Sequence, residues 1–416
     1  MTGLGADTAA AAPVFTLLGP AFLLFAVLAV GLAALVRKSQ TVFGAVLLCL
    51  NLAFFWMVGS NWKSLLAVAV FIHVAYALVL MQRRPSTPWT KWLSIAGIAG
   101  FWVVLFLMKN PDVFGRFSPS AFLDASIIGV SYLAFRAISA IMDGPDLEAV
   151  DYLSFVNYMV FFPTLMAGPI ERYEPFRAGY VQPEPVGIDE GLAAGKRITL
   201  GFVKKFVLAD NLAPLGVFAF GPAPQSAPTL VLWLGVLLQL ALIFLDFSGY
   251  CDIMIGLARL MGFKLQENFS KPYFARNIQE FWDRWHMSLT YFVRDYVFTP
   301  ICKFIFWRVE RAKQFPYVAA TYFFTMLVIA LWHKVSWGFL LFGVMHGTAL
   351  VLLQMKRRFV DKSAFAKTPF GGALIKPPLP VAIALTWTYF AISTAAWFFP
   401  PGVTWAIVLK LFGVDT

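Results

Sequence analysis

Long uncharged runs of apolar residues recur from one end of this chain to the other, and no other feature limits its fold so strongly. A helix needs roughly 20 such residues to cross a bilayer. Runs near that length lie at 13–36, 41–58, 64–81, 92–108, 229–245, 315–332, 335–355 and 379–399. Weaker runs lie at 125–142, which contains Arg136, and at 155–166. We predict an all-α polytopic membrane protein with roughly 9–11 transmembrane helices.

The composition agrees and excludes several classes of protein. Hydrophobic residues make up 60% of the chain and charged residues 13%, whereas a soluble domain has about 25% charged residues. So few charges cannot cover a soluble surface, which excludes a soluble enzyme, a disordered tail and a fibrous protein. The formal net charge of +11 is explained by basic cytoplasmic loops, so we expect no nucleic-acid partner. Cys49, Cys251 and Cys302 follow no metal or redox spacing, so we expect neither a disulfide nor a metal site.

The distribution of basic residues predicts which side of the membrane each loop occupies. The first eight residues contain Asp7 but neither Lys nor Arg, whereas Arg37 and Lys38 follow the first apolar run. By the positive-inside rule we expect a multi-pass protein of the cell membrane with an extracytoplasmic N-terminus. Basic residues between 356 and 367 place the preceding span end in the cytoplasm. The start of that span, just after His333, is therefore expected to face outward.

Four histidines are the first candidates for chemistry, because an ionisable residue at membrane depth is costly and is a functional candidate by default. His73 lies in the middle of a run of Ala, Val and Phe, where a packing role is expected. His286, His333 and His346 lie in the second half of the chain. On residues alone, His333 suits a catalytic position and a plain interfacial loop equally, because it lies between two hydrophobic runs.

The segment 277–298 combines many polar residues with helical periodicity. Taken as one helix, it gathers its apolar residues within an arc of about 120°. That arc holds Phe281, Trp282, Trp285, Leu289, Phe292, Val293 and Tyr296. The opposite side holds Glu280, Asp283, Arg284, Ser288, Thr290, Arg294 and Asp295, with His286 at the boundary. An interfacial helix on the cytoplasmic surface shows this pattern. A helix lining a polar cavity shows it too, and the many Trp residues and paired charges favour the cavity.

Several motifs, in this order and with these spacings, resemble those of one known family. The core motifs lie at 268–273 (NFSKPY), 278–289 (IQEFWDRWHMSL) and 294–297 (RDYV). Others lie at 167–173 (AGPIERY), 246–250 (DFSGY), 331–333 (LWH) and 343–346 (GVMH). Residues 124–355 thus resemble the membrane-bound O-acyltransferase (MBOAT) family. The run 127–135 (IIGVSYLAF) is similar to members that transfer D-alanyl groups in teichoic acid modification. In one departure, Lys334 stands where the family usually has Gly.

The resemblance implies a fold and a set of site residues. The fold is one helical-bundle domain over 1–416, with N-terminal spans at 1–123, a core at 124–355 and a C-terminal span at 356–416, around a central passage. His333 corresponds to the family's catalytic histidine, and His286 to its second characteristic polar position. The expected substrate-binding residues are Trp282, Arg284, Trp285, Ser288, Arg294, Asp295, Trp332 and His346.

The resemblance also implies a reaction. A thioester on the phosphopantetheine arm of a carrier protein enters from the cytoplasm, and a hydroxyl acceptor of the cell envelope enters from outside. We expect a short acyl or aminoacyl group, foremost D-alanyl, to be transferred, with His333 as general base. His286 is expected either to orient the donor or to stabilise the developing charge. No bound cofactor is expected. The expected partners are an acyl carrier protein of the D-alanyl type, an accessory envelope transfer protein and membrane lipid.

The carrier is expected to dock on basic cytoplasmic residues. Arg308, Arg311 and Lys313 follow the polar segment and are the candidates, although the positive-inside rule alone also accounts for them. Two other functions stay open on the sequence. One is an O-acetyltransferase of alginate, cellulose or peptidoglycan, and the other is a transporter that performs no chemistry.

Overall fold

The computed structural model describes residues 19–58, 61–85, 87–114, 129–220 and 227–414. The chain divides into two compact units, which we call unit 1 (residues 1–202 and 250–266) and unit 2 (residues 203–249 and 267–416). In the described parts the regular secondary structure is helical, with a single isolated β-bridge between Phe269 and Trp285. The expected all-α polytopic fold is confirmed, while the single-domain organisation stays a prediction.

Seven described helices are long and apolar enough to cross a membrane. They are α3 (Gln40–Met57), α4 (Trp62–Gln82), α5 (Pro88–Lys109), α13 (Thr229–Leu260), α17 (Gln314–His333), α18 (Trp337–Met355) and α20 (Leu379–Phe398). Their bounds agree closely with the predicted runs, except that α13 continues past residue 245. Its first acidic residue, Asp246, forms an ion pair of 2.6 Å with Lys205, so the charge does not end the helix.

Shorter described helices coincide in part with the other predicted spans. These are α2 (Pro20–Val36), α8 (Val130–Asp143) and α9 (Tyr152–Val160), the last followed by the 3-10 turn η4 (Phe162–Thr164). Pro163 lies in η4 and cannot supply a helical N–H, which explains why α9 is brief. Towards the C-terminus the chain adds α21 (Pro401–Leu411). The first part of the predicted run 13–36 and residues 125–128 lie outside the described residues, so the total of 9–11 spans stays a prediction.

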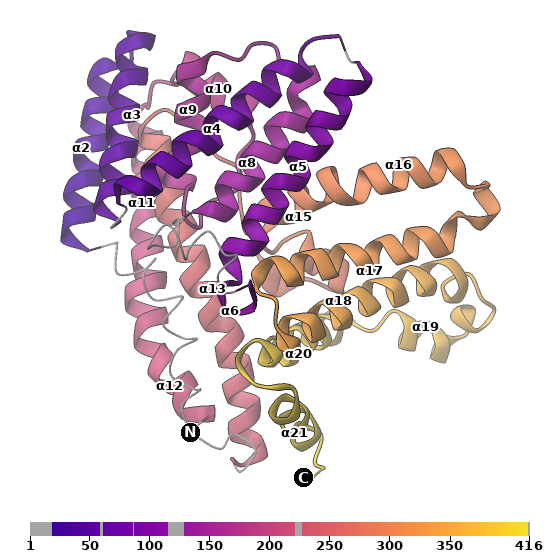
Figure 1. Ribbon diagram of the computed structural model, residues 1–416. Helices are drawn as coiled ribbons and strands as arrows, with labels where there is room; N and C mark the ends of the chain where they lie inside the picture. Colours follow the sequence, from indigo (N-terminus) through magenta and orange to yellow (C-terminus); the bar gives the residue numbers. More distant parts are fainter. Residues whose placement is uncertain (1–18, 59–60, 86, 115–128, 221–226, 415–416) are drawn as a thin grey trace. The chain divides into compact units, whose positions relative to one another are not determined.

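Polar side chains join the helices of unit 1, in which α2 lies beside α3, and α8 lies beside α4 and α5 (Figure 1). The side-chain amide of Asn51 in α3 donates to Asn157 Oδ1 in α9 at 3.1 Å, and Asn157 donates to the Gly44 carbonyl at 3.0 Å. Asn51 Oδ1 also accepts the backbone N–H of Phe162 at 2.9 Å. Such bonds replace the water that membrane-embedded polar groups lack.

A buried charged cluster holds the AGPIERY motif within unit 1. Arg136 in α8 is fully buried and donates to the carbonyls of Tyr158 and Met159, both at 2.7 Å. Glu171 is also buried, and its carboxylate accepts the backbone N–H of Arg172 at 3.2 Å. The Arg136 bonds tie α8 to the end of α9, and the Tyr158 hydroxyl donates to the Glu171 carbonyl at 3.1 Å, so the motif is joined to α9.

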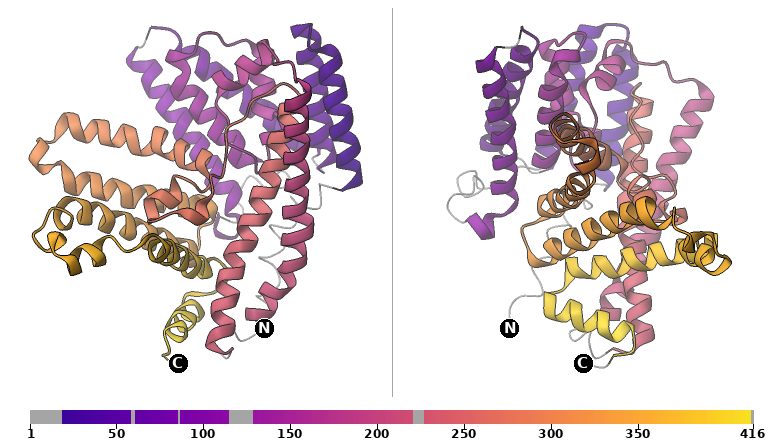
Figure 2. Two further views of the ribbon diagram at one scale, coloured as in Figure 1. Left: turned by 180° about the vertical axis from the view of Figure 1, so that it is seen from behind. Right: turned by 90° about the vertical axis from the view of Figure 1, so that its right-hand side faces the viewer.

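Close helix approach organises unit 2, where α18 packs against both α17 and α20 (Figures 1 and 2). Three glycines of α18 make this possible. A Cβ at Gly343 would lie 2.8 Å from Ala330 Cβ, and one at Gly347 would lie 2.8 Å from the Phe323 ring. A Cβ at Gly338 would lie 1.8 Å from the Ala396 carbonyl oxygen of α20. Small residues at such contacts are how helices in membranes come together.

The first prediction concerns Glu171, which lies outside the seven candidate spans. Burial raises the pKa of its carboxyl from 4.5 to about 7. The folded protein therefore holds this proton in a pH range where the unfolded chain has lost it, so stability should decrease as pH rises from about 4.5 to 7. In Glu171→Gln, the decrease in the free energy of unfolding over this pH range should be smaller by about 3 kcal/mol. Thermal unfolding in detergent, followed across pH, measures the effect.

The exposed Glu148 supplies the control, since Glu148→Gln should leave the pH profile of unfolding unchanged. A profile as steep in Glu171→Gln as in wild type would show that another group is responsible.

Candidate active site

The polar segment 277–298 is not the continuous helix that its periodicity predicts. It consists of α14 (Ile278–Trp282), α15 (Met287–Val293) and the π-helical turn η8 (Arg294–Phe298), which continues as α16 (Thr299–Arg308). The break lies at His286, whose φ of 45° is in the left-handed region. A non-glycine residue there is strained and needs support from its surroundings.

Hydrogen bonds to the NFSKPY motif provide that support. The backbone N–H of Ser270 donates to the Arg284 carbonyl at 3.0 Å, and that of Met287 donates to the Asn268 carbonyl at 2.9 Å. These bonds flank the β-bridge between Phe269 and Trp285. The pairing holds residues 284–287 against 268–270, and helical periodicity cannot reveal a partner so far away in the sequence.

The break changes which side chains are buried. Phe281, Trp285 and Leu289 are buried, as the apolar arc predicts. His286 and Ser288, predicted at the boundary and on the polar side, are buried as well, with 4% and 1% of their surface exposed. The segment thus carries two polar side chains into the interior of unit 2.

Asn268 determines the protonation pattern of His286. Its Oδ1 accepts the backbone N–H of Ser288 at 3.2 Å and the Ser288 hydroxyl at 2.7 Å. The backbone N–H fixes the orientation of the amide, because only the oxygen can accept it. The same Oδ1 lies 3.2 Å from His286 Nδ1, which must therefore carry the ring proton and donate. Nε2 is left as the acceptor atom of the ring.

The surroundings of His286 keep its ring uncharged. The residue lies outside the seven candidate spans, and burial lowers its pKa to about 3. The Phe247 ring meets the imidazole edge-on at 4.8 Å, and the Trp332 ring lies 6.4 Å away. His286 is thus a neutral hydrogen-bond acceptor in aromatic surroundings.

His333 is the last residue of α17 and is only half-buried. Its imidazole stacks on Phe339 with the centroids 5.3 Å apart and lies 5.6 Å from the Trp397 ring. The neighbouring Trp332 ring lies 4.3 Å from it and also contacts His286. Lys334 has an extended backbone, with φ −166°, so the position occupied by Gly in the family does not require glycine here.

His346 in α18 uses both ring nitrogens within the protein. The Trp282 indole donates to Nδ1 at 3.4 Å, so Nε2 carries the proton and donates to Ser393 Oγ at 2.8 Å. The Ser393 hydroxyl in turn donates to the Phe390 carbonyl at 2.7 Å. This chain of bonds joins α14, α18 and α20, which is a structural role.

His73 in unit 1 is engaged in the same way. Its Nδ1 lies 2.7 Å from the Ala69 carbonyl oxygen, and its Nε2 lies 2.7 Å from the Tyr152 hydroxyl. The His73 side chain is exposed and bonded within unit 1, so its packing role stays a prediction.

The charged residues predicted to bind substrate form local pairs. Arg284 bonds Glu280 at 2.7 Å, and Arg294 bonds Asp295 at 2.7 Å. The expected docking residues are exposed on unit 2, where the Arg308 guanidinium lies 4.9 Å from the Trp307 ring centre. Within the described ranges, no group of three or more His, Cys, Asp or Glu side chains is placed to hold a metal ion.

Some residues of the site carry no signal in the sequence alone. Asn268 lies in the NFSKPY motif, but its role depends on its contact with His286, which lies 18 residues further along the chain. Ser393 and Trp397 lie beyond the motifs, in α20, whose sequence is typical of an ordinary apolar span. Only the packing of α18 against α20 brings them next to the histidines.

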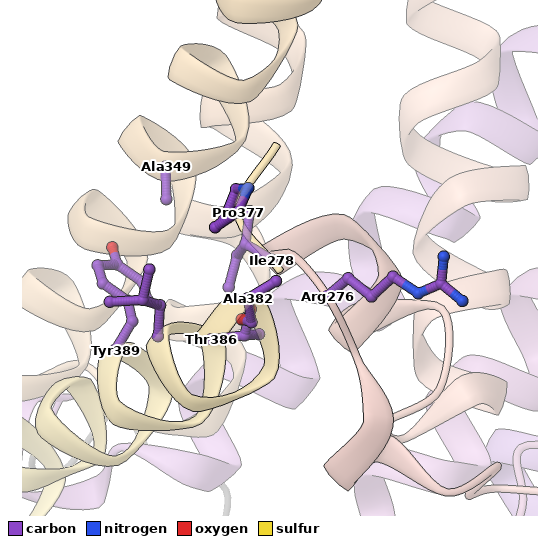
Figure 3. A pocket seen from close by; sticks show the side chains of 8 residues that line it. Arg276, Ile278, Ala349, Pro377, Ala382, Thr386 and Tyr389 are labelled. Carbon is purple, nitrogen blue, oxygen red and sulfur yellow. The ribbon is translucent and has the colours of Figure 1, made fainter. Parts of the chain in front are cut away.

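A shallow pocket of about 210 Å³ lies in unit 2, near the start of α20 (Figure 3). Its lining is mostly apolar and includes Ile278, Ala382 and Tyr389, while the Arg276 side chain extends away from the other lining residues. Neither His286 nor His333 lines it. The Tyr389 hydroxyl is committed to the Met345 carbonyl at 2.7 Å, so the pocket offers few polar groups for chemistry.

The second prediction tests the hydrogen bonds that Asn268 Oδ1 accepts from Ser288 and His286. Asn268→Leu removes the acceptor of three buried donors, and each unsatisfied donor costs about 1–3 kcal/mol. The melting temperature should fall, and His286 should lose its fixed Nδ1–H form. Nitrogen-15 NMR of histidine-labelled protein reports the tautomer directly, with His286→Gln identifying the signal. An Nε2–H form of His286 in the wild-type protein would contradict the assignment.

Comparison with known proteins agrees with the motifs. The sequence profile of the MBOAT, membrane-bound O-acyltransferase family, matches residues 52–392. A probable alginate O-acetylase AlgI of Pseudomonas aeruginosa is 30% identical over 348 residues, covering 76% of this chain and 65% of the relative. A teichoic acid D-alanyltransferase of Streptococcus thermophilus is 32% identical over 313 residues, covering 71% of this chain and 72% of the relative.

A peptidoglycan O-acetyltransferase of Helicobacter pylori is 33% identical over 201 residues, covering 48% of this chain and 37% of the relative. The chain spans just under two thirds of the length of the alginate relative, at 65%. The profile match covers far more than half of the chain and includes α17, α18 and most of α20. The chain therefore belongs to the membrane-bound O-acyltransferase family.

Proposed function

We propose that this protein is a membrane acyltransferase that moves a short acyl or aminoacyl group, foremost D-alanyl, from a thioester to a hydroxyl of the cell envelope. The observation that carries the proposal is the setting of His333, a half-buried imidazole in an aromatic cluster at the end of α17. The teichoic acid D-alanyltransferase that aligns with 71% of the chain supports the choice of transferred group.

The other histidines support the choice of His333 as general base. His73 and His346 each have both ring nitrogens hydrogen-bonded within the protein. His286 is buried and bound to Asn268, and its lowered pKa makes it a weak base. A general base must reach the proton that it removes, and His333 has the exposed surface to do so.

The reaction then proceeds by direct transfer. The acceptor hydroxyl gives its proton to His333 as its oxygen attacks the thioester carbonyl carbon. The carbon–sulfur bond breaks, and the proton held by His333 passes to the leaving thiolate. The products are an ester and a free thiol, and His333 is neutral again. The faces of Phe339 and Trp397 offer a favourable surface to the transient imidazolium.

His286 is proposed to orient the donor. Its Nε2 is an acceptor held in one direction by the Nδ1 bond to Asn268. A phosphopantetheine arm carries amide N–H groups that such an acceptor can bind. The carrier protein at the cytoplasmic face, an accessory envelope transfer protein, surrounding membrane lipid and an extracytoplasmic N-terminus belong to the same proposal.

A second candidate is O-acetylation of an exported polysaccharide or of peptidoglycan. The relatives named as alginate O-acetylase and peptidoglycan O-acetyltransferase favour it. The two candidates share the chemistry at His333 and differ in the transferred group and in the acceptor polymer. Parallel assays with D-alanyl and acetyl thioesters of a carrier protein distinguish them.

The third prediction concerns the base itself. His333→Ala should reduce transfer by the purified protein to below about a hundredth of wild type, because general base catalysis contributes roughly 10²–10⁴-fold. Transfer of a radiolabelled group from carrier thioester to a hydroxyl acceptor is the measurement. His73→Ala is the control and should keep most of the activity, because both His73 ring nitrogens are hydrogen-bonded within unit 1. Activity of His333→Ala above a hundredth would rule out His333 as the base.

The fourth prediction concerns docking of the carrier. Carrier proteins of this class are acidic, so Arg308→Glu with Arg311→Glu should weaken carrier binding and make the remaining binding less sensitive to salt. The control reverses Arg37 and Lys38, which are exposed on a different loop. Binding is measured by surface plasmon resonance at low and moderate salt. If the affinity for the carrier is unchanged at both salt concentrations, the positive-inside rule alone explains why Arg308 and Arg311 are basic.

A further inference from the structure

We infer that the indole N–H of Trp397 is a further catalytic group, which donates a hydrogen bond to the carbonyl oxygen of the acyl donor as that oxygen gains negative charge. The inference rests on the proposed function, because it names a second group for the same transfer step. Trp397 is near the end of α20, beyond the motifs that identify the family.

The starting point is an unsatisfied donor. Trp397 Nε1 is buried, and no acceptor among the described residues lies within hydrogen-bonding distance of it. An indole N–H can only donate, and leaving such a group buried and unbonded costs about 1–3 kcal/mol. Unsatisfied buried groups are rare in native proteins, and each one calls for a reason.

The position of the ring provides the reason. The Trp397 ring lies 5.6 Å from the His333 ring and stacks on Phe339 at 5.4 Å. Phe339 stacks in turn on His333 at 5.3 Å, so the three rings are in mutual contact. A hydroxyl that gives its proton to His333 must lie about 2.6–3.2 Å from the imidazole. The carbonyl that it attacks therefore lies beside the same aromatic cluster, of which the indole is a part.

The packing around Trp397 holds its donor in place. Phe342 meets the Trp397 ring edge-on at 5.0 Å. Ala396 precedes Trp397 in α20 and lies close to Gly338 of α18. A Cβ built on Gly338 would be 1.8 Å from the Ala396 carbonyl oxygen. The indole is thus held in place relative to α18, as a preorganised hydrogen-bond donor requires.

The chemistry of acyl transfer needs such a donor. When the hydroxyl oxygen bonds to the carbonyl carbon, the π electrons of the C=O bond move onto its oxygen and create an oxyanion. A hydrogen bond to that oxygen stabilises the tetrahedral intermediate until the carbon–sulfur bond breaks and the C=O bond forms again. One donor of this kind contributes roughly 10²–10³-fold to kcat.

The same helix supplies a matched control. Trp387 Nε1 is also buried without an acceptor in the described structure. Its ring, however, contacts Phe281 at 6.2 Å, and Phe281 is linked to Trp397 through the rings of Phe390 and Phe342. Ten residues separate the two tryptophans, which is about 15 Å along a helix. Trp387→Phe therefore removes an unsatisfied N–H from α20 without changing the ring next to His333.

The experiment compares Trp397→Phe and Trp387→Phe with wild-type protein in detergent. Thiol release from D-alanyl and acetyl thioesters of pantetheine is followed with lipoteichoic acid as acceptor. Trp397→Phe should lower kcat by about 10²–10³-fold and leave KM for the thioester little changed. Its melting temperature should stay the same or rise, because the removed N–H makes no bond in the resting protein. Trp387→Phe should keep its activity.

The outcomes separate the inference from the function on which it rests. The inference alone would be overturned by a kcat for Trp397→Phe within threefold of wild type, provided that wild type transfers the acyl group and His333→Ala does not. A lower melting temperature for Trp397→Phe, with equal kcat losses in both variants, would mean a packing role and would also overturn it. Absence of acyl transfer by wild-type protein with either thioester would overturn the proposed function together with the inference.

Discussion

The close approach of α18 to two neighbouring helices is the contact on which the site in unit 2 depends. Gly343 and Gly347 let α17 lie against one side of α18, and Gly338 lets α20 lie against it near its N-terminal end. His333 comes from α17, and Trp397 comes from α20. Van der Waals contact between helices is a main source of their association in lipid, so the glycines determine both the stability of this arrangement and the geometry of the aromatic cluster.

Polar groups in unit 2 fall into two kinds, and the difference separates structure from chemistry. The chain from Trp282 through His346 to Ser393 satisfies each ring nitrogen of the histidine, and it joins three helices. Asn268 likewise satisfies Ser288 and one nitrogen of His286. The N–H of Trp397 is left without an acceptor beside His333. Trp387 Nε1 is unsatisfied as well, so it is the position of Trp397 beside His333 that distinguishes it.

Much of the fold can be predicted from the sequence, because apolar length alone determines where a span lies. The runs for α3, α4, α17, α18 and α20 agree with the helices to within a few residues. The prediction fails for α13, because a search for uncharged runs stops at Asp246, whose charge is in fact paired with Lys205. It fails again at 277–298, because periodicity takes no account of the pairing with the NFSKPY motif that breaks the helix at His286.

The site was accessible from the sequence only in part. The motifs identify His333, His286 and Trp332, and the structure places Trp332 in contact with both histidines. The motifs predict His346 as a substrate-binding residue, and the structure shows in addition that its ring joins three helices. Trp397 could not be found at all, because nothing in an apolar helix distinguishes one tryptophan from another until the neighbouring helix is known.

The central claim is that the donor carbonyl lies at the aromatic cluster around His333. The most direct measurement is a cryo-electron microscopy structure of the protein bound to a stable amide analogue of D-alanyl-pantetheine. The account predicts density for the analogue with its carbonyl oxygen within hydrogen-bonding distance of Trp397 Nε1 and its carbonyl carbon beside His333. Density in the apolar pocket lined by Ile278, Ala382 and Tyr389, with the cluster unoccupied, would contradict it.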